Sequence, residues 1–403
     1  MIDHEDQPIL RHLSVFSGLG GMDVGLERAG FTNVGTIEFD ALAKEALRLN
    51  RPDWRSIGTG DVMDVAKWLS AKDLSLDVGD LDLLSGGPPC QPFSTASLWS
   101  SNGRRGMQDD RARTLHALTD LINRIQPKFV LIENVLGFVQ GPGSALPYLK
   151  SRLRASAHLS KAGYELTWRL YNAADIGVPQ NRRRVIVILR RRDQPQWSWP
   201  KPTHADSPLT AWDALHDLKS TEIPSPSGSW TGLLPSIPEG ENYQWLTSHG
   251  GGEEVFGYRT KYWSFLLKLS KAKPSWTLAA SPGPATGPFH WDNRPLSVQE
   301  MLRLQSFPDD WKVPGDYRSQ VRLIGNATPP LLAETVGLRI RQLITGHAAA
   351  PTLLRGRGPT PPMPTAPIPV AETYRNLVGK KEAHAGEGAG PAARTKPGFT
   401  TPE

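Results

Sequence analysis

Cysteine is almost absent from this sequence of 403 residues, in which Cys90 is the only one. A single cysteine excludes an internal disulfide and any zinc site that is built from several cysteines. No apolar run approaches the roughly 20 residues of a membrane-spanning helix, and the acidic N-terminus lacks the basic-then-apolar order of a signal peptide. We therefore expect a protein with no membrane partner in a reduced, cytoplasmic setting, where a lone thiol stays reactive.

A strong excess of one charge is also lacking. The formal net charge is +6 and the isoelectric point about 9.3, which allows a polyanionic partner without requiring one. Half of the excess lies in residues 347–403, which hold seven Lys or Arg against four Glu. That segment is rich in Pro, Ala and Gly and has almost no apolar periodicity, so we interpret it as a disordered tail.

The chain opens with the pattern of a nucleotide-binding β-α-β unit. A short strand at 13–16 leads into a glycine-rich loop and a helix that ends near Gly30. Asp23 occupies the place of the third glycine in G-x-G-x-x-G, which suits a cofactor with a cationic end and no phosphate better than a pyrophosphate. The next strand ends at Glu38, about 20 residues after the glycines, the usual distance for an acid that binds ribose hydroxyls.

A thiol and a carboxylate follow two later strands. Cys90 comes after the apolar run 81–84 and a loop stiffened by Pro88 and Pro89, and Glu133 ends the buried strand that starts at Phe129. Since about one β-α-β unit separates them, both are expected at the same edge of one parallel sheet. A lone cysteine is often a small buried hydrophobe, and Glu133 also fits a helix N-terminus, but their coincidence favours a reactive site.

Two other features leave alternatives open. Asp61 precedes an amphipathic run and fits either a surface turn or a binding site. Arg182 and Arg184 share one face of a strand predicted at 180–189, because side chains alternate along a strand. They fit either an exposed basic strand entry or an anion clamp beside the thiol.

The composition changes after Arg192. Nine of the thirteen tryptophans lie between Trp197 and Trp311, interleaved with Pro, Gly, Ser and basic residues. This pattern predicts a second, irregular domain, whose aromatics serve either nucleic-acid binding or its own core. We expect a leader at 1–10, a catalytic domain at 11–195 that residues 320–346 complete, the second domain at 196–319, and the tail from 347.

Taken in order, these segments resemble the cytosine-5 DNA methyltransferases of prokaryotic or phage type, from about Leu13 to Ile344. The most specific strings are Pro89-Cys90-Gln-Pro-Phe-Ser94 and Glu133-Asn-Val135. The others are Phe16-Ser-Gly-Leu-Gly-Gly-Met-Asp23, Glu38-Phe-Asp40, Gly60-Asp-Val62, Gln180-Asn-Arg-Arg-Arg184, Arg294-Pro-Leu-Ser-Val-Gln-Glu300 and Gly325-Asn-Ala327.

The resemblance implies an α/β fold of the S-adenosylmethionine (AdoMet)-dependent, Rossmann-like type. It has a mixed sheet and a smaller, irregular target-recognition domain. AdoMet would be the co-substrate, with no metal. Glu38 would hold the ribose hydroxyls and Asp61 the adenine amino group, while Phe39 stands where a larger aromatic is common. The implied cofactor residues are Phe16, Gly18, Leu19, Gly20, Glu38, Phe39, Asp61, Val62, Pro89, Asn326 and Ala327.

The implied reaction transfers a methyl group to C5 of a cytosine that is flipped out of double-stranded DNA. The Cys90 thiolate would attack C6, because this converts an unreactive ring into an enamine. Glu133 would contact N3 and the exocyclic amine, and Arg182 and Arg184 would fix the base or its phosphate. The loop 94–111, rich in Gly and Arg, is our candidate for closing over the base.

Three other functions remain as alternatives. The same catalytic set acts on tRNA cytosine in one branch of the family, and a regulator that binds DNA without activity would keep the fold. A nicotinamide dehydrogenase is opposed by Asp23 and by the Cys90–Glu133 pair. We expect a monomer in a bacterial or phage-infected cytoplasm, either an orphan methylase or one paired with a restriction endonuclease.

Overall fold

The computed structural model describes residues 8–89, 113–141, 143–156, 163–220, 222–258 and 263–375. The chain divides into two compact units. Unit 1 comprises Met1–Ser220, Pro274–Ser281 and Val298–Pro359, and unit 2 comprises Thr221–Lys273, Pro282–Ser297 and Thr360–Glu403. No helix in the described part of the chain is long and apolar enough to span a bilayer.

Unit 1 is built on a mixed sheet of six strands in the order β2-β1-β3-β4-β6-β5. The strands are β1 (Leu10–Val15), β2 (Phe31–Ile37), β3 (Leu83–Gly86), β4 (Phe129–Asn134), β5 (Tyr164–Asn172) and β6 (Arg183–Arg191). The first four run parallel, and β6 runs antiparallel to both β4 and β5. The expected α/β fold with a mixed sheet is confirmed.

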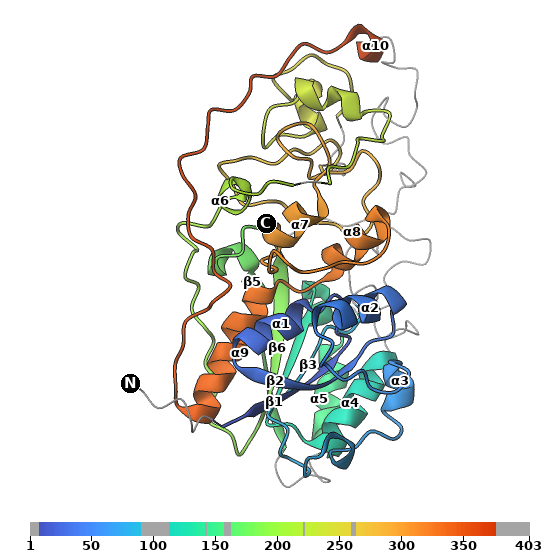
Figure 1. The fold of residues 1–403 in the computed structure, drawn as a ribbon, viewed down its shortest axis with the longest axis vertical. Helices are drawn as coiled ribbons and strands as arrows, with labels where there is room; N and C mark the ends of the chain where they lie inside the picture. The colour runs from blue at the N-terminus through green and yellow to red at the C-terminus, as the bar shows by residue number, and fades with distance from the viewer. Residues whose placement is uncertain are drawn as a thin grey trace. The chain divides into compact units, whose positions relative to one another are not determined.

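Helices cover both faces of this sheet (Figure 1). Helices α1 (Gly21–Arg28) and α9 (Pro330–Thr345) pack on the face that presents Leu83 and Phe129. Helices α3 (Val62–Val65), α4 (Thr114–Ile125) and α5 (Leu146–Ser156) pack on the other face. Because both faces are covered, strands such as β4 are continuous apolar runs rather than alternating ones.

The remaining elements belong to both units. They are α2 (Ala41–Asn50), α6 (Ala211–Leu215), α7 (Val298–Leu304), α8 (Tyr317–Asn326), α10 (Glu372–Arg375), and the 3₁₀ turns η1 (Lys72–Leu74), η5 (Leu136–Phe138), η6 (Ala173–Ile176), η7 (Thr231–Ser236) and η8 (Tyr243–Leu246). Of these, η7, η8 and α10 are those of unit 2. Pro147 lies in the first turn of α5, where a missing N–H breaks no helical hydrogen bond.

The carboxyl ends of the parallel strands meet at one edge. Glu38 follows β2, Pro88 and Pro89 follow β3, and Glu133 lies near the end of β4. Strands β3 and β4 are direct parallel neighbours, with Gly86 opposite Ile132. The expected placement of these two strand ends at one edge is confirmed, while Cys90 itself lies outside the described residues.

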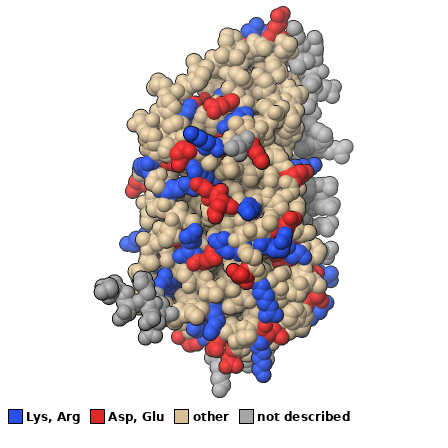
Figure 2. Space-filling model, in the orientation of Figure 1, with Lys and Arg blue, Asp and Glu red and all other residues tan. Residues whose placement is uncertain are grey.

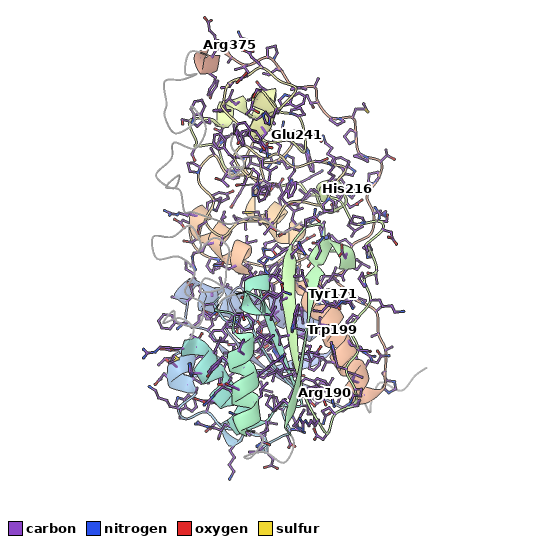
Figure 3. The ribbon with its side chains drawn as sticks, turned by 180° about the vertical axis from the view of Figure 1, so that it is seen from behind. Tyr171, Arg190, Trp199, His216, Glu241 and Arg375 are labelled. Atoms are coloured by element: carbon purple, nitrogen blue, oxygen red, sulfur yellow. The ribbon has the colours of Figure 1, made fainter. Side chains whose placement is uncertain are left out.

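Unit 1 extends further along the chain than the composition indicated. Trp197 and Trp199 belong to it, although the second domain was expected to start at 196. Both pack against the core on the α9 face, where the Trp199 ring centroid lies 6.1 Å from that of Tyr171 on β5 (Figure 3). The tryptophan-rich part of the sequence therefore starts before the end of unit 1 at Ser220, because its first two rings cover the sheet.

Unit 2 has a core of aromatic and aliphatic side chains around Trp230, Tyr243 and Phe256. Two of its lysines, Lys268 and Lys271, are buried. Lys268 Nζ donates to the carbonyls of Leu234 and Ile237, and burial lowers its pKa to about 8. Lys271 pairs with Glu239. On the face in view, Lys and Arg are interspersed with Asp and Glu over the surface (Figure 2).

Residues 347–375 are mostly exposed, but several of them make specific contacts that a disordered tail would not make. Residues 376–403 lie outside the described part. The Glu334 carboxylate on α9 is 0% exposed and accepts hydrogen bonds from the backbone N–H and hydroxyl of Thr352 and from the N–H of Leu353. Further along, Val370 is buried in the core of unit 2. The contacts that hold residues 352–358 are polar and backbone hydrogen bonds, so this part carries no apolar periodicity.

This packing predicts that the effect of one substitution depends on the segment. In the full chain, Glu334→Gln should lower the free energy of unfolding by about 1–3 kcal/mol, because charged hydrogen bonds are lost. In a chain that ends at Gly346, the same substitution should cost much less, because the donors from Thr352 and Leu353 are already gone. Urea unfolding of the four proteins measures both effects, and an equal effect in the two backgrounds would contradict the packing.

Candidate active site

A cavity of about 560 Å³ opens at the carboxyl edge of the sheet in unit 1. That volume is within the range of small-molecule sites. The loops after β1, β2, β3 and β4, together with α8 and the turn that follows it, form its walls. Of the residues expected to bind the cofactor, those that line it are Phe16, Gly18, Leu19, Glu38, Phe39, Asp61, Val62, Pro89, Asn326 and Ala327.

Gly20 does not line the cavity but shapes its wall from behind. Its φ of +84° is strained for any side chain, and a Cβ there would lie 2.8 Å from Leu47 Cδ2 and 3.1 Å from Trp311 Cζ2. Trp311 in turn donates from Nε1 to the Leu19 carbonyl at 3.1 Å. A glycine at this position lets α2 and Trp311 support the loop closely.

Glu38 is fixed at one end of the cavity. It is 9% exposed and accepts from the backbone N–H of Gly18 and of Asp40, both at 2.7 Å. Burial raises its pKa. Each carboxylate oxygen keeps a lone pair for a further donor, so the orientation suits a pair of hydroxyl groups.

The two readings of Asp61 are compatible. Its side chain caps α3 by accepting from the N–H of Met63 at 2.9 Å, and it also lines the cavity. Phe39 lines the cavity with 73% of its surface exposed, which leaves its ring free to stack on a planar group.

Sequence reasoning missed several residues of this wall. Asp40 caps α2 and pairs with Arg322 of α8 at 2.8 Å, and both line the cavity with Thr114. Arg322 lies one helical turn before Asn326 on α8, so the two share one helix face. This spacing could have predicted that Arg322 lies near the cofactor site.

The other end of the cavity holds Glu133 and Arg184. The Glu133 side chain, 10% exposed, forms an ion pair with Arg184, with 2.7 Å between Oε1 and Nε. The pair forms because β4 and β6 are antiparallel neighbours, with Asn134 opposite Val185. An ion pair in so sheltered a place orients the carboxylate toward whatever occupies the cavity.

Asn134 fixes the chain that leads to Cys90. It is 1% exposed, and its Nδ2 donates to the Pro88 carbonyl at 2.9 Å. Its Oδ1 accepts from the N–H of Val135 at 2.9 Å. The backbone is therefore held two residues before Cys90, although Cys90 and the loop 94–111 lie outside the described residues.

The strand pattern predicted that Arg182 and Arg184 lie on the same face of one strand, but the structure separates them. Arg182 precedes β6 and is 1% exposed, with Nη2 donating to the carbonyls of Gly325 at 2.8 Å and Ala327 at 2.9 Å. The period of two does not apply outside the strand. Arg182 does not line the cavity, and it holds from behind the turn that does.

The comparisons with known proteins agree with this geometry. A family model described as C-5 cytosine-specific DNA methylase matches residues 10–342. The chain belongs to this family.

Other members of the C-5 cytosine-specific DNA methylase family are similar over most of the chain. It is 32% identical to the type II methyltransferase M.SacI of Streptomyces achromogenes, over 80% of this chain and 90% of that protein. It is 31% identical to M.NgoMIV of Neisseria gonorrhoeae, over 81% and 96%. A solved DNA modification methyltransferase from an E. coli prophage shares the fold, with a TM-score of 0.58, 23% identity and coverage of 83% of this chain and 99% of that chain.

The cavity of this methylase fits AdoMet, the methyl donor that the family uses. The oriented Glu38 carboxylate faces it at one end, Phe39 offers an exposed ring, and Glu38 and Asp61 add negative charge suited to a cation. Among the described residues, no group of three or more His, Cys, Asp or Glu is arranged to hold a metal ion.

Proposed function

We propose that this protein methylates C5 of a cytosine within a specific sequence of double-stranded DNA, through a covalent bond between Cys90 and C6. One observation carries the proposal. A single cavity joins an end suited to AdoMet, at Glu38 and Asp61, to an end where Glu133 is oriented by Arg184. Methyl transfer needs donor and acceptor in one enclosed space.

The chain's own groups act on the base in sequence. The Cys90 thiolate adds to C6 and makes C5 nucleophilic. Glu133 holds N3 and the exocyclic amine, and so neutralises the charge that develops on the ring. AdoMet supplies the methyl group from its sulfonium. Loss of the C5 proton to a base then expels the thiolate and restores the aromatic ring.

The cofactor end has separate roles. Glu38 accepts from the ribose hydroxyls, because its two oxygens are already oriented by backbone N–H groups. Asp61 accepts from the adenine amino group, and Phe39 stacks on the adenine. Arg182 is a positioning residue for the turn that carries Asn326, rather than a group that touches the base.

Unit 2 is the proposed target-recognition domain, and the cytosine is flipped out of the duplex at a cost of a few kcal/mol. DNA is favoured over tRNA because the matching family model is described as a DNA methylase and the prophage structure as a DNA modification methyltransferase. Pairing with a restriction endonuclease follows from the type II methyltransferases among those relatives. We retain a cytoplasmic monomer as part of the proposal.

Bisulfite sequencing of plasmid DNA from cells that express the protein tests this function. Cytosines that resist conversion should occur at one short sequence, and they should be absent from cells that express Cys90→Ser. Modified cytosine in tRNA but not in the plasmid would overturn the choice of substrate. Full conversion in every nucleic acid would overturn the activity.

A further inference from the structure

Asp23 is a buried carboxylate that has no ion pair among the described residues. It lies in the first turn of α1 and is 1% exposed. Among the described residues, neither of its oxygens has a hydrogen-bond donor in good geometry. Leaving such a group unpaired in the interior costs free energy, so packing alone does not explain an acid at this position.

A pair of hydroxyl groups separates Asp23 from the cavity. The Ser14 hydroxyl lies beside the Asp23 carboxyl and is hydrogen-bonded to the Ser17 hydroxyl at 2.7 Å. Both serines line the cavity. The field of an ionised Asp23 therefore reaches the cavity across two buried hydroxyl groups, where it is weakly screened.

The charges around the cavity are unbalanced. Among the described residues, the arginines that line it are Arg184 and Arg322, and they pair with Glu133 and Asp40. Glu38 and Asp61 line the same cavity and have no ion pair within the described residues, and Asp23 adds a third acid behind them. The site therefore favours a ligand with net positive charge.

We propose that Asp23 is the counter-ion of the cationic methyl donor, acting through Ser14 and Ser17, and that it makes the pocket discriminate the charged donor from its neutral product. The inference rests on the proposed function, since it takes AdoMet as the ligand of this cavity. AdoMet carries a sulfonium, and transfer of its methyl group leaves S-adenosylhomocysteine, a neutral thioether. Asp23 touches neither the base nor the reacting atoms, so it is a positioning residue that acts through charge.

The titration of Asp23 gives the proposal a pH signature. Burial raises its pKa to about 7. A bound cation lowers that pKa, so donor affinity should rise as the pH increases through about 7, whereas product affinity should stay nearly flat. Among the described residues, the charged groups that act on Asp23 are Glu38 and Glu27, and both raise its pKa.

Two other buried groups near these elements do not change that signature. On β1, burial lowers the pKa of His12 to about 3, so it stays neutral there. On α9, which packs on α1, Glu334 is held by Thr352 and Leu353.

Calorimetric titration of the full chain with AdoMet, with sinefungin and with S-adenosylhomocysteine, at pH 6 and pH 8, tests the inference. At pH 8, Asp23→Asn should weaken AdoMet and sinefungin, which are both cationic, by about tenfold, as loss of about one pKa unit of coupling would. The neutral product should weaken less than twofold. Glu45→Gln removes an exposed acid of α2 and should change none of the three affinities.

Each outcome decides. Equal weakening of the three ligands by Asp23→Asn, or no weakening at all, would overturn the inference and leave the proposed function standing. Wild-type protein that binds none of the three would overturn both. The amide removes an unpaired buried charge, so the unliganded variant should melt no lower than wild type at pH 8. Ser14→Ala is a second test that leaves Asp23 in place. It should also weaken AdoMet and sinefungin more than it weakens S-adenosylhomocysteine.

Discussion

Replacing Cys90 by serine is expected to lower DNA methylation by more than about a thousandfold, as removal of a nucleophile does in other covalent enzymes. A serine hydroxyl ionises far less readily than a thiol and is a much weaker nucleophile near neutral pH. AdoMet affinity should change less than twofold, because the contacts proposed for the cofactor come from other residues.

Tritiated methyl transfer to duplex DNA measures the loss, and calorimetry with AdoMet shows that the variant is folded. Turnover near the wild-type rate, with cofactor binding intact, would exclude attack by Cys90. Loss of both turnover and cofactor binding would instead contradict the separation of the two ends of the cavity.

Replacing Glu133 by glutamine should lower kcat by about 10²- to 10⁴-fold, the usual contribution of a positioned acid or base. The amide keeps the shape but cannot neutralise charge on the ring as the cytosine is attacked. It also leaves Arg184, 16% exposed, without its ion-pair partner. The KM for AdoMet should change little, because Glu38 and Asp61 lie at the other end of the cavity.

Glu165→Gln is the matched control. Glu165 on β5 also pairs with a buried arginine of β6, Arg190, at 2.5 Å, but neither lines the cavity. Steady-state kinetics of the two variants separates chemistry from the stability of the sheet. An equal fall in kcat for both would show that Glu133 acts only through the fold.

The sequence predicted the parts of the site that depend on short-range order. Three parts of the site can be recognised from a few neighbouring residues each. They are the glycine loop after β1, the proline loop after β3 and the carboxylate near the end of β4. Parallel neighbours then bring their ends to one edge, so Glu38, Pro89 and Glu133 could be expected in the same cavity.

Long-range contacts were not predictable in the same way. Arg182 and Arg184 are two residues apart, yet one holds the carbonyls of Gly325 and Ala327 while the other pairs with Glu133. A strand pattern cannot show where the strand begins to within one residue. The burial of Lys268 was not predictable either, because it depends on carbonyl groups that lie about thirty residues earlier in the chain.

Composition also misplaced the borders of the units. Trp199 marked a change in residue usage but covers the sheet of unit 1. Thr352 lies in a Pro-rich stretch whose composition resembles a disordered tail. It is held by a hydrogen bond to Glu334, a buried acid on the preceding helix α9. Neither contact leaves a periodic pattern along the chain.

The central claim is that the sulfur of Cys90 bonds to the cytosine ring. A duplex that carries 5-fluorocytosine at the methylated position tests it most directly, because fluorine cannot leave C5 as a proton and the adduct persists after methyl transfer. Incubation with AdoMet should yield a protein–DNA complex that survives denaturation, with the modified peptide mapped to Cys90. The same duplex with ordinary cytosine at that position is the control and should be bound and methylated. If the control is methylated and the 5-fluorocytosine duplex forms no such complex, the covalent mechanism is wrong.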